Sequence, residues 1–277
     1  MKEWKMKQYE KVLGGLGMPE ELIALATGRL QLPNGINEQP ARCYGFPPAL
    51  IPFWSAPDAM IYTGYWSHWF ADRDASFVKM YVKLGYVVSE IARTCEQFKA
   101  YEVLNELVFA DESTPEVADF AAKLGVDLGQ IEQFAETHGD DPTQLYLLPE
   151  FAVRTPLESC SGSKGYDGGF PTVSNANGSA NKQASSFELN ETTARAFLAS
   201  PDCPPWLKTT DKQHLFQTYL SAGDLTSAWF TLNSSGWNFA AARAALTKLA
   251  HHSEVDNFHA MVEAWLSLPH EQYGVGY

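Results

Sequence analysis

His68 is the side chain whose neighbours in this sequence are best suited to acid–base chemistry. It lies in the aromatic run Tyr65–Phe70, and Asp72, Arg73 and Asp74 follow within a few residues. Aromatic walls would remove water from the imidazole and shift its pKa, and a nearby carboxylate would orient the ring. The pattern predicts a hydrolase-type site made of His68, Asp72 and Asp74. The alternative is a histidine at a strand end whose ring is hydrogen-bonded to the backbone.

Two further groups of residues match known sites in type and spacing. Ser161-Gly162-Ser163-Lys164 fits the S-x-x-K pattern of a serine nucleophile beside a lysine base, but it lies in a low-complexity stretch where a preorganised site is hard to build. His251, His252 and His259 could bind Zn²⁺, but they show no rigid set of three ligands. GxGxxG, Walker A, GxSxG and HExxH motifs are absent from the sequence. We therefore expect no metal and no cofactor.

Acidic residues are concentrated in one stretch of the chain. The net charge is -13, from 20 Lys+Arg and 33 Asp+Glu, which disfavours nucleic acid and anionic lipid as partners. Eleven carboxylates and a single basic residue, Lys123, lie between positions 102 and 141: Glu102, Glu106, Asp111, Glu112, Glu116, Asp119, Asp127, Glu132, Glu136, Asp140 and Asp141. This stretch is either a solvated helical face or a docking face for a basic protein.

Aromatic residues are concentrated in a second stretch. Seven lie within 24 residues: Trp54, Tyr62, Tyr65, Trp66, Trp69, Phe70 and Phe77. Alternation along a strand sends Tyr65 and Trp69 to one face and Trp66 and Phe70 to the other. One set can form core while the other forms a partner-binding patch, because aromatic side chains dominate interface energetics. The alternative is that both sets are core.

The elements that must position these residues follow from hydrophobic periodicity and capping signals. The patterns predict helices over residues 20–27, 47–54 and 87–108, strands over 60–66 and 78–84, and further helices after Thr114 and Asp127. Helices around few strands indicate an α+β fold, with a small mixed sheet flanked by helices.

A change in composition divides the chain. Residues 157–190 contain 7 Ser, 5 Gly and 4 Asn and read as a flexible linker or long loop. We expect an α+β domain over residues 1–156 and an all-α helical domain over residues 191–277. Helices of the second domain are expected to begin after Asn190, at Asp211, at Asp224, after Asn238 and after Ser253, where small polar residues can cap them.

Several features predict a cytoplasmic protein. The four cysteines, Cys43, Cys95, Cys160 and Cys203, are too widely spaced for a metal knuckle or a disulfide framework. The N-terminal residues lack the apolar run of a signal peptide. No stretch approaches the ~20 apolar residues that cross a bilayer.

The order of motifs between about residues 15 and 108 resembles the SMI1/KNR4, or SUKH, superfamily. The resemblance rests on Met18–Ile23, the proline-led segment Phe46–Trp54, the aromatic strand Gly64–Phe70, residues Phe77–Leu84 and the helix with Ser89–Ala92. It implies an α+β fold with a mixed sheet. Many bacterial members of this superfamily are immunity proteins that bind and neutralise toxins.

The combined features predict a non-enzymatic immunity protein that occludes the active surface of a basic partner, such as a secreted toxin. Aromatic anchors and acidic residues would make the contact: Tyr65, Trp66, Trp69, Glu102, Glu106, Asp111, Glu112, Glu116, Asp119, Glu132 and Glu136. The alternatives are an enzyme using His68, Asp72 and Asp74, and a scaffold whose C-terminal helices act as an adaptor.

Overall fold

The computed structural model of the chain describes residues 2–38, 45–71, 75–84, 86–152, 201, 204–268 and 275–277. Helix α1 (Lys2–Gly15) leads into α2 (Glu20–Thr27). Pro19 precedes α2, two acidic residues occupy its first turn, and Gly28 ends it at φ 75°, a conformation that glycine adopts without strain. The predicted helix over residues 20–27 is therefore confirmed.

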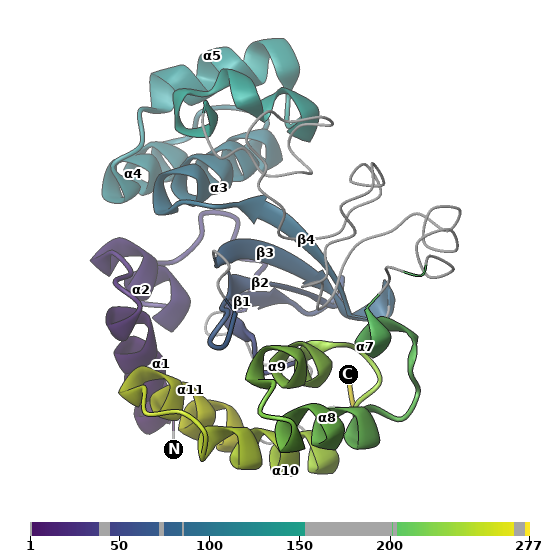
Figure 1. Ribbon diagram of the computed structural model, residues 1–277. Helices are drawn as coiled ribbons and strands as arrows, with labels where there is room; N and C mark the ends of the chain where they lie inside the picture. The colour runs from purple at the N-terminus through teal and green to yellow at the C-terminus, as the bar shows by residue number, and fades with distance from the viewer. Residues whose placement is uncertain are drawn as a thin grey trace.

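A four-stranded sheet follows, with the strand order β1-β2-β3-β4 (Figure 1). Its strands are β1 (Leu50–Ala56), β2 (Ile61–Trp66), β3 (Ser76–Tyr81) and β4 (Val87–Ala92). A short 3₁₀ turn, η1 (Val82–Leu84), follows β3. The α+β class is confirmed. The sheet is purely antiparallel rather than mixed, because consecutive strands joined by short connections can only pair antiparallel.

Two of the predicted helices are wrong in part or in whole. Residues Leu50–Ala56 form β1, where the missing N–H of Pro52 is tolerated because β1 is an edge strand. The helix predicted from residue 87 begins only at Cys95, because Val87–Ala92 pair with β3 as β4. The apolar residues of this segment have helical spacing, but the segment is a strand because its pairing with β3 stabilises the extended form.

Three helices form a layered unit on one side of the sheet (Figure 1): α3 (Cys95–Ala110) packs next to the sheet, and α4 (Pro115–Leu124) and α5 (Leu128–His138) pack on α3. The side chains of Thr94, Thr114 and Asp127 cap their N-termini, as the sequence predicts for the last two. Two 3₁₀ turns, η2 (Pro142–Leu147) and η3 (Pro149–Phe151), follow. Phe98 of α3 stacks on Phe77 with ring centroids 4.3 Å apart and meets Phe53 edge-on at 5.6 Å, which fixes α3 on the sheet.

The C-terminal part is all-helical, as predicted. It contains α7 (Pro205–Lys208), α8 (Lys212–Ser221), α9 (Leu225–Asn233), α10 (Phe239–Ala250) and α11 (Asp256–Leu266). Asp211, Asp224 and Asn238 cap α8, α9 and α10 through their side chains, which confirms three predicted starts. The start predicted after Asn190 and the linker over residues 157–190 lie outside the described residues.

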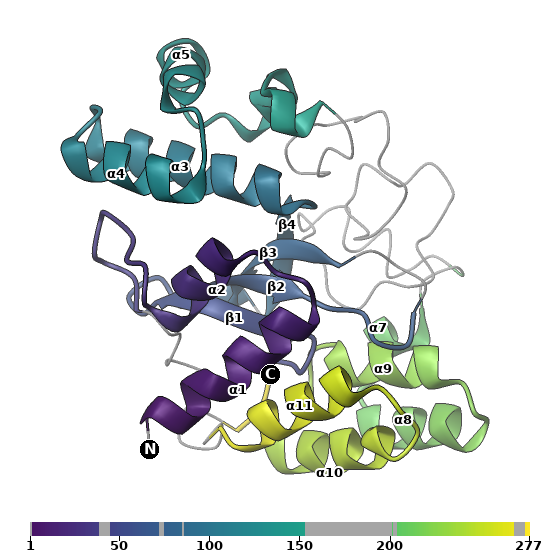
Figure 2. The same ribbon diagram turned by 90° about the vertical axis from the view of Figure 1, so that its left-hand side faces the viewer.

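The C-terminal helices pack directly against the N-terminal part of the chain. Figure 2 shows α1 lying along α11, and buried residues of both parts belong to one hydrophobic cluster. Trp265 donates its indole N–H to the carbonyl oxygen of Phe46 at 2.9 Å, and the amide of Ala49 donates to Oδ1 of Asn233 at 2.6 Å. The predicted division into domains 1–156 and 191–277 therefore concerns two segments that share a core.

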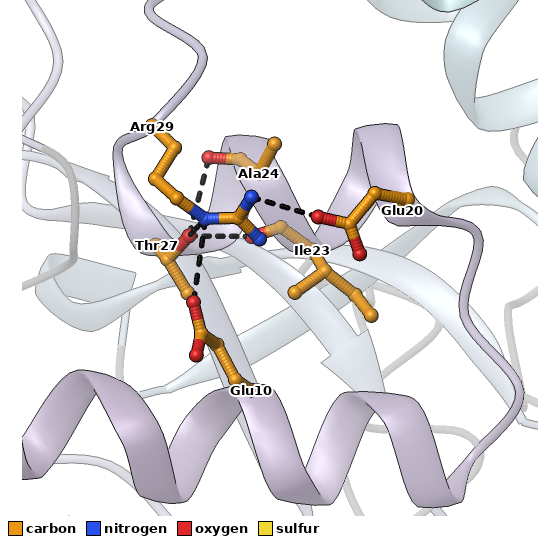
Figure 3. Close-up of polar contacts among 6 residues, drawn as sticks. All are labelled: Glu10, Glu20, Ile23, Ala24, Thr27 and Arg29. Atoms are coloured by element: carbon orange, nitrogen blue, oxygen red, sulfur yellow. Dashed lines mark hydrogen bonds and ion pairs between the residues drawn. The ribbon is translucent and has the colours of Figure 1, made fainter.

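Residues 29–38, the first part of the connection between α2 and β1, are anchored at three points. Arg29 contacts Glu10 of α1 at 3.3 Å and Glu20 of α2 at 2.7 Å (Figure 3). Asn34 hydrogen-bonds to Glu106 of α3, and Glu38 exchanges two backbone hydrogen bonds with Ser55 of β1. We call this segment the α2–β1 loop.

Candidate functional site

The acidic stretch lies on the end of α3 and on α4 and α5. Helix α4 buries Val117, Phe120, Ala121 and Leu124, so its charged residues face solvent on the opposite side. Five of the predicted partner-binding carboxylates are exposed, namely Asp111, Glu112, Glu116, Asp119 and Glu136, and Glu132 is half-buried. Lys123, the one basic residue of the stretch, lies 2.5 Å from Asp119 across one helical turn. The surface of this layer is therefore strongly acidic.

The prediction that Glu102 and Glu106 lie on the binding surface is wrong, because both side chains point inward from α3. Their exposed fractions are 4% and 3%. Glu102 lies one turn after the buried Phe98, and Glu106 lies one turn further, so all three occupy the same helix face. Neither side chain is available to a partner protein.

Each buried glutamate has a defined surrounding. Glu106 accepts hydrogen bonds from the backbone N–H of Asn34 at 2.8 Å and from its side-chain amide at 2.5 Å. Beside Glu102, Lys79 of β3 donates to the hydroxyl of Tyr101 at 2.9 Å. Oε1 of Glu102 has no hydrogen-bond partner among the described residues. Glu102 therefore stays in the core with part of its carboxyl group unsatisfied.

Both buried glutamates have raised pKa values. Burial raises the pKa of Glu102 to about 7, Lys79 opposes that rise, and the neighbouring Glu106 adds to it. Burial also raises the pKa of Glu106 to about 7, and the hydrogen bond from the backbone of Asn34 opposes this. These two carboxyl groups therefore change charge near neutral pH.

The predicted aromatic anchors are in the core or packed against it. Trp66 is fully buried, so its prediction as an exposed anchor is wrong. Tyr65 is half-buried with its ring edge-on to Phe77 at 5.1 Å, and burial raises the pKa of its hydroxyl to about 12. Trp69 is half-buried against Phe258 of α11 at 5.5 Å. Trp69 and Phe70 thus join the sheet to α11, whereas Tyr65 packs on Phe77, which stacks on Phe98 of α3.

The catalytic alternative is not assembled by the described residues. His68 is half-buried with its ring 6.0 Å from that of Phe230, while Asp72, Arg73 and Asp74 lie outside the described residues. The S-x-x-K match at Ser161–Lys164 lies outside them too. A site made of His68, Asp72 and Asp74 therefore stays a prediction.

The C-terminal histidines are held apart. His251 and His252 are exposed at the end of α10, and the ring of His259 lies 2.8 Å from the carbonyl oxygen of Ser253. Over the residues that the structure describes, no three His, Cys, Asp or Glu side chains are grouped so that they could hold a metal ion.

None of the helices within the described residues has the length and hydrophobicity that a membrane span needs.

Three exposed apolar side chains, on the α2–β1 loop and at the end of α3, escaped the sequence prediction. Ile36 in the α2–β1 loop and Val108 and Phe109 at the end of α3 are exposed by 60%, 36% and 59%. The signal was present as the run Leu107–Ala110, four consecutive apolar residues in a helix. A helix buries one face, so such a run must expose part of itself.

Comparison of the chain with models of known protein families, with curated proteins and with solved structures finds no match.

Proposed function

We propose that this protein is a non-enzymatic binding protein of the immunity type, which captures a basic protein such as a secreted toxin and occludes its active surface. The observation that carries the proposal is the set of exposed carboxylates on the end of α3, α4 and α5, with Lys123 as the one basic residue among them. A surface of one sign accelerates the encounter with an oppositely charged partner and disfavours wrong ones.

The resemblance of residues 15–108 to the SMI1/KNR4 superfamily supports the same proposal. The helix α2 and the aromatic strand β2 stand in the order that the resemblance implies. The proline-led segment and Ser89–Ala92, which the resemblance makes helical, contribute instead to the strands β1 and β4. We also place this protein in the cytoplasm, because its four widely spaced cysteines are typical of a reducing compartment.

The experiment begins with the partner. The tagged full-length protein is used to capture proteins from its source organism at low salt, because salt screens the attraction between charged surfaces least under that condition. The association rate of the purified partner is then measured at increasing salt, and its toxicity is measured with and without co-expression of this protein. We expect a basic partner, a rate that falls steeply with salt, and loss of toxicity on co-expression.

Two charge variants locate the binding face. D111K/E112K/E116K reverses three exposed charges of the acidic layer, and D58K/E254K/E263K reverses three exposed charges elsewhere. We expect the first variant to slow association by about tenfold or more and the second to change it far less, within the range known for steering. An acidic partner, a salt-independent rate, or equal effects of the two variants would contradict the proposal.

A further inference from the structure

We propose that the partner docks through a basic amphipathic segment on one patch, made of Ile36 and Phe109 with Asp111 and Glu112 at its border. We call it the acid-rimmed patch. The inference rests on the proposed function, since it specifies where and how a basic protein would bind.

Hydrogen bonds bring the two halves of the acid-rimmed patch together. Glu106 of α3 accepts from the backbone and side-chain amides of Asn34, and Oδ1 of Asn34 accepts from the backbone N–H of Ile36 at 3.0 Å. Ile36 therefore follows Asn34 by two residues, and Phe109 follows Glu106 by three. Figures 1 and 2 both show the α2–β1 loop next to α3 and α4.

Ion pairs connect α2 to α3 and to the start of the α2–β1 loop, which favours an ordered patch. Lys99 of α3 pairs with Glu21 of α2, and this hydrogen bond lowers the pKa of Glu21. Arg29 fixes the start of the loop (Figure 3). A surface that is already ordered loses little conformational entropy on binding.

The carboxyl end of α3 carries uncompensated negative charge, which favours binding of a cation. The carboxyl end of a helix carries the negative end of its dipole, which a basic residue in the last turn usually offsets. The last turn of α3, which is described in full, contains no basic residue, and Asp111 and Glu112 follow it directly. A lysine or arginine from a partner would relieve this accumulation of negative charge.

The backbone conformation of Asp111 places the rim on a sharp turn. Asp111 ends α3 at φ 60°, a left-handed conformation that aspartate tolerates better than most residues. The chain turns there, so the two acidic residues border the apolar side chains instead of continuing the helix. A partner segment with an apolar side chain flanked by basic residues would match this surface, because its apolar side chain meets the apolar centre and its basic residues meet the acidic rim.

A second copy of this chain is a poor occupant, because two acidic rims would repel each other. Sedimentation of the full-length protein alone tests this occupant directly. If F109S converts a dimer into a monomer, the patch binds a second copy, and the inference of a basic partner segment is overturned.

The direct test uses a defined probe, a fluorescent 14-residue peptide of leucine and lysine at helical spacing, titrated with the full-length protein. We expect F109S and I36S each to weaken binding by about tenfold, as for truncation of an exposed anchor. V255S, which removes a side chain of similar exposure (51%) just before α11, should leave binding unchanged within about twofold. A peptide with serine in place of leucine should bind far more weakly.

The outcomes separate this inference from the proposed function. If the peptide does not bind, or if F109S, I36S and V255S behave alike, the acid-rimmed patch is not the docking site. The proposed function is then still decided by the natural partner and the D111K/E112K/E116K variant. If the natural partner binds and F109S weakens it about tenfold while V255S does not, both stand.

Discussion

Replacing Glu102 by glutamine should change how the stability of this protein depends on pH. The carboxyl group of Glu102 is 4% exposed, its Oε1 has no hydrogen-bond partner among the described residues, and Glu106 lies one helical turn away. Lys79 and a hydrogen bond with the side chain of Asn105 favour the charged form, but burial outweighs them. The ionised carboxylate is therefore destabilised in the folded state.

The direction and size of the effect follow from the pKa. Burial raises the pKa of Glu102 from 4.5 to about 7. Between these values the folded protein holds a proton that the unfolded chain has released, so the free energy of unfolding decreases as the pH rises. At 1.36 kcal/mol per pKa unit the loss is about 3 kcal/mol, complete just above pH 7. Glutamine cannot ionise, so E102Q should lose this part of the pH dependence.

The assay is urea unfolding of the full-length protein and E102Q at several pH values from 4 to 8.5. We expect similar stabilities near pH 4 and an advantage for E102Q at pH 8 of up to about 3 kcal/mol. The partial loss of the attraction to Lys79 reduces this advantage. The matched control is E116Q, which removes an exposed carboxylate of the same stretch and should show no such trend. A difference between E102Q and the parent protein that does not grow with pH would refute the reasoning.

Two other substitutions test the packing that positions these elements. N233A leaves the buried N–H of Ala49 without its acceptor at 2.6 Å and should lower the free energy of unfolding by about 2 kcal/mol. An N233A protein as stable as the parent in urea would show that this contact between α9 and the sheet is dispensable. G64A places a Cβ atom 2.4 Å from the carbonyl oxygen of Ile51, so β1 and β2 must separate. We expect a loss of more than about 2 kcal/mol, and an unchanged melting temperature would contradict the close approach of these strands.

Local signals in the sequence predicted the helix starts well. Asp211, Asp224 and Asn238 cap helices because the capping side chain reaches backbone N–H groups two or three residues away, and no distant contact is needed. The start of β1 was missed for the opposite reason. Residues Leu50–Ala56 are extended because β2 pairs with them, and that pairing is invisible in the local pattern.

The candidate site was predicted only in outline. The acidic stretch was identified from composition, yet Glu102 and Glu106 were assigned to the surface because glutamate is seldom buried. The helical phase would have predicted burial, since Glu102 and Glu106 follow Phe98 at intervals of one turn and so lie on the same helix face. The aromatic anchors were misplaced because a strand pattern gives two faces but does not say which elements cover them. The packing of Trp69 on Phe258 depends on a helix almost 190 residues later in the sequence.

The acidic stretch thus uses its carboxylates in two ways, which bears on how the binding surface responds to pH. Of the eleven carboxylates between Glu102 and Asp141, two are buried with pKa values near 7, and nine remain at least partly exposed. The exposed carboxylates set the rate at which a basic partner arrives, because steering depends on charge at the surface. The buried pair sets how much of the free energy of unfolding is lost as the pH rises from about 4.5 to just above 7. Lowering the pH from 8 to 6 should therefore stabilise the fold while leaving most of the attraction intact, so stability and association respond to pH separately.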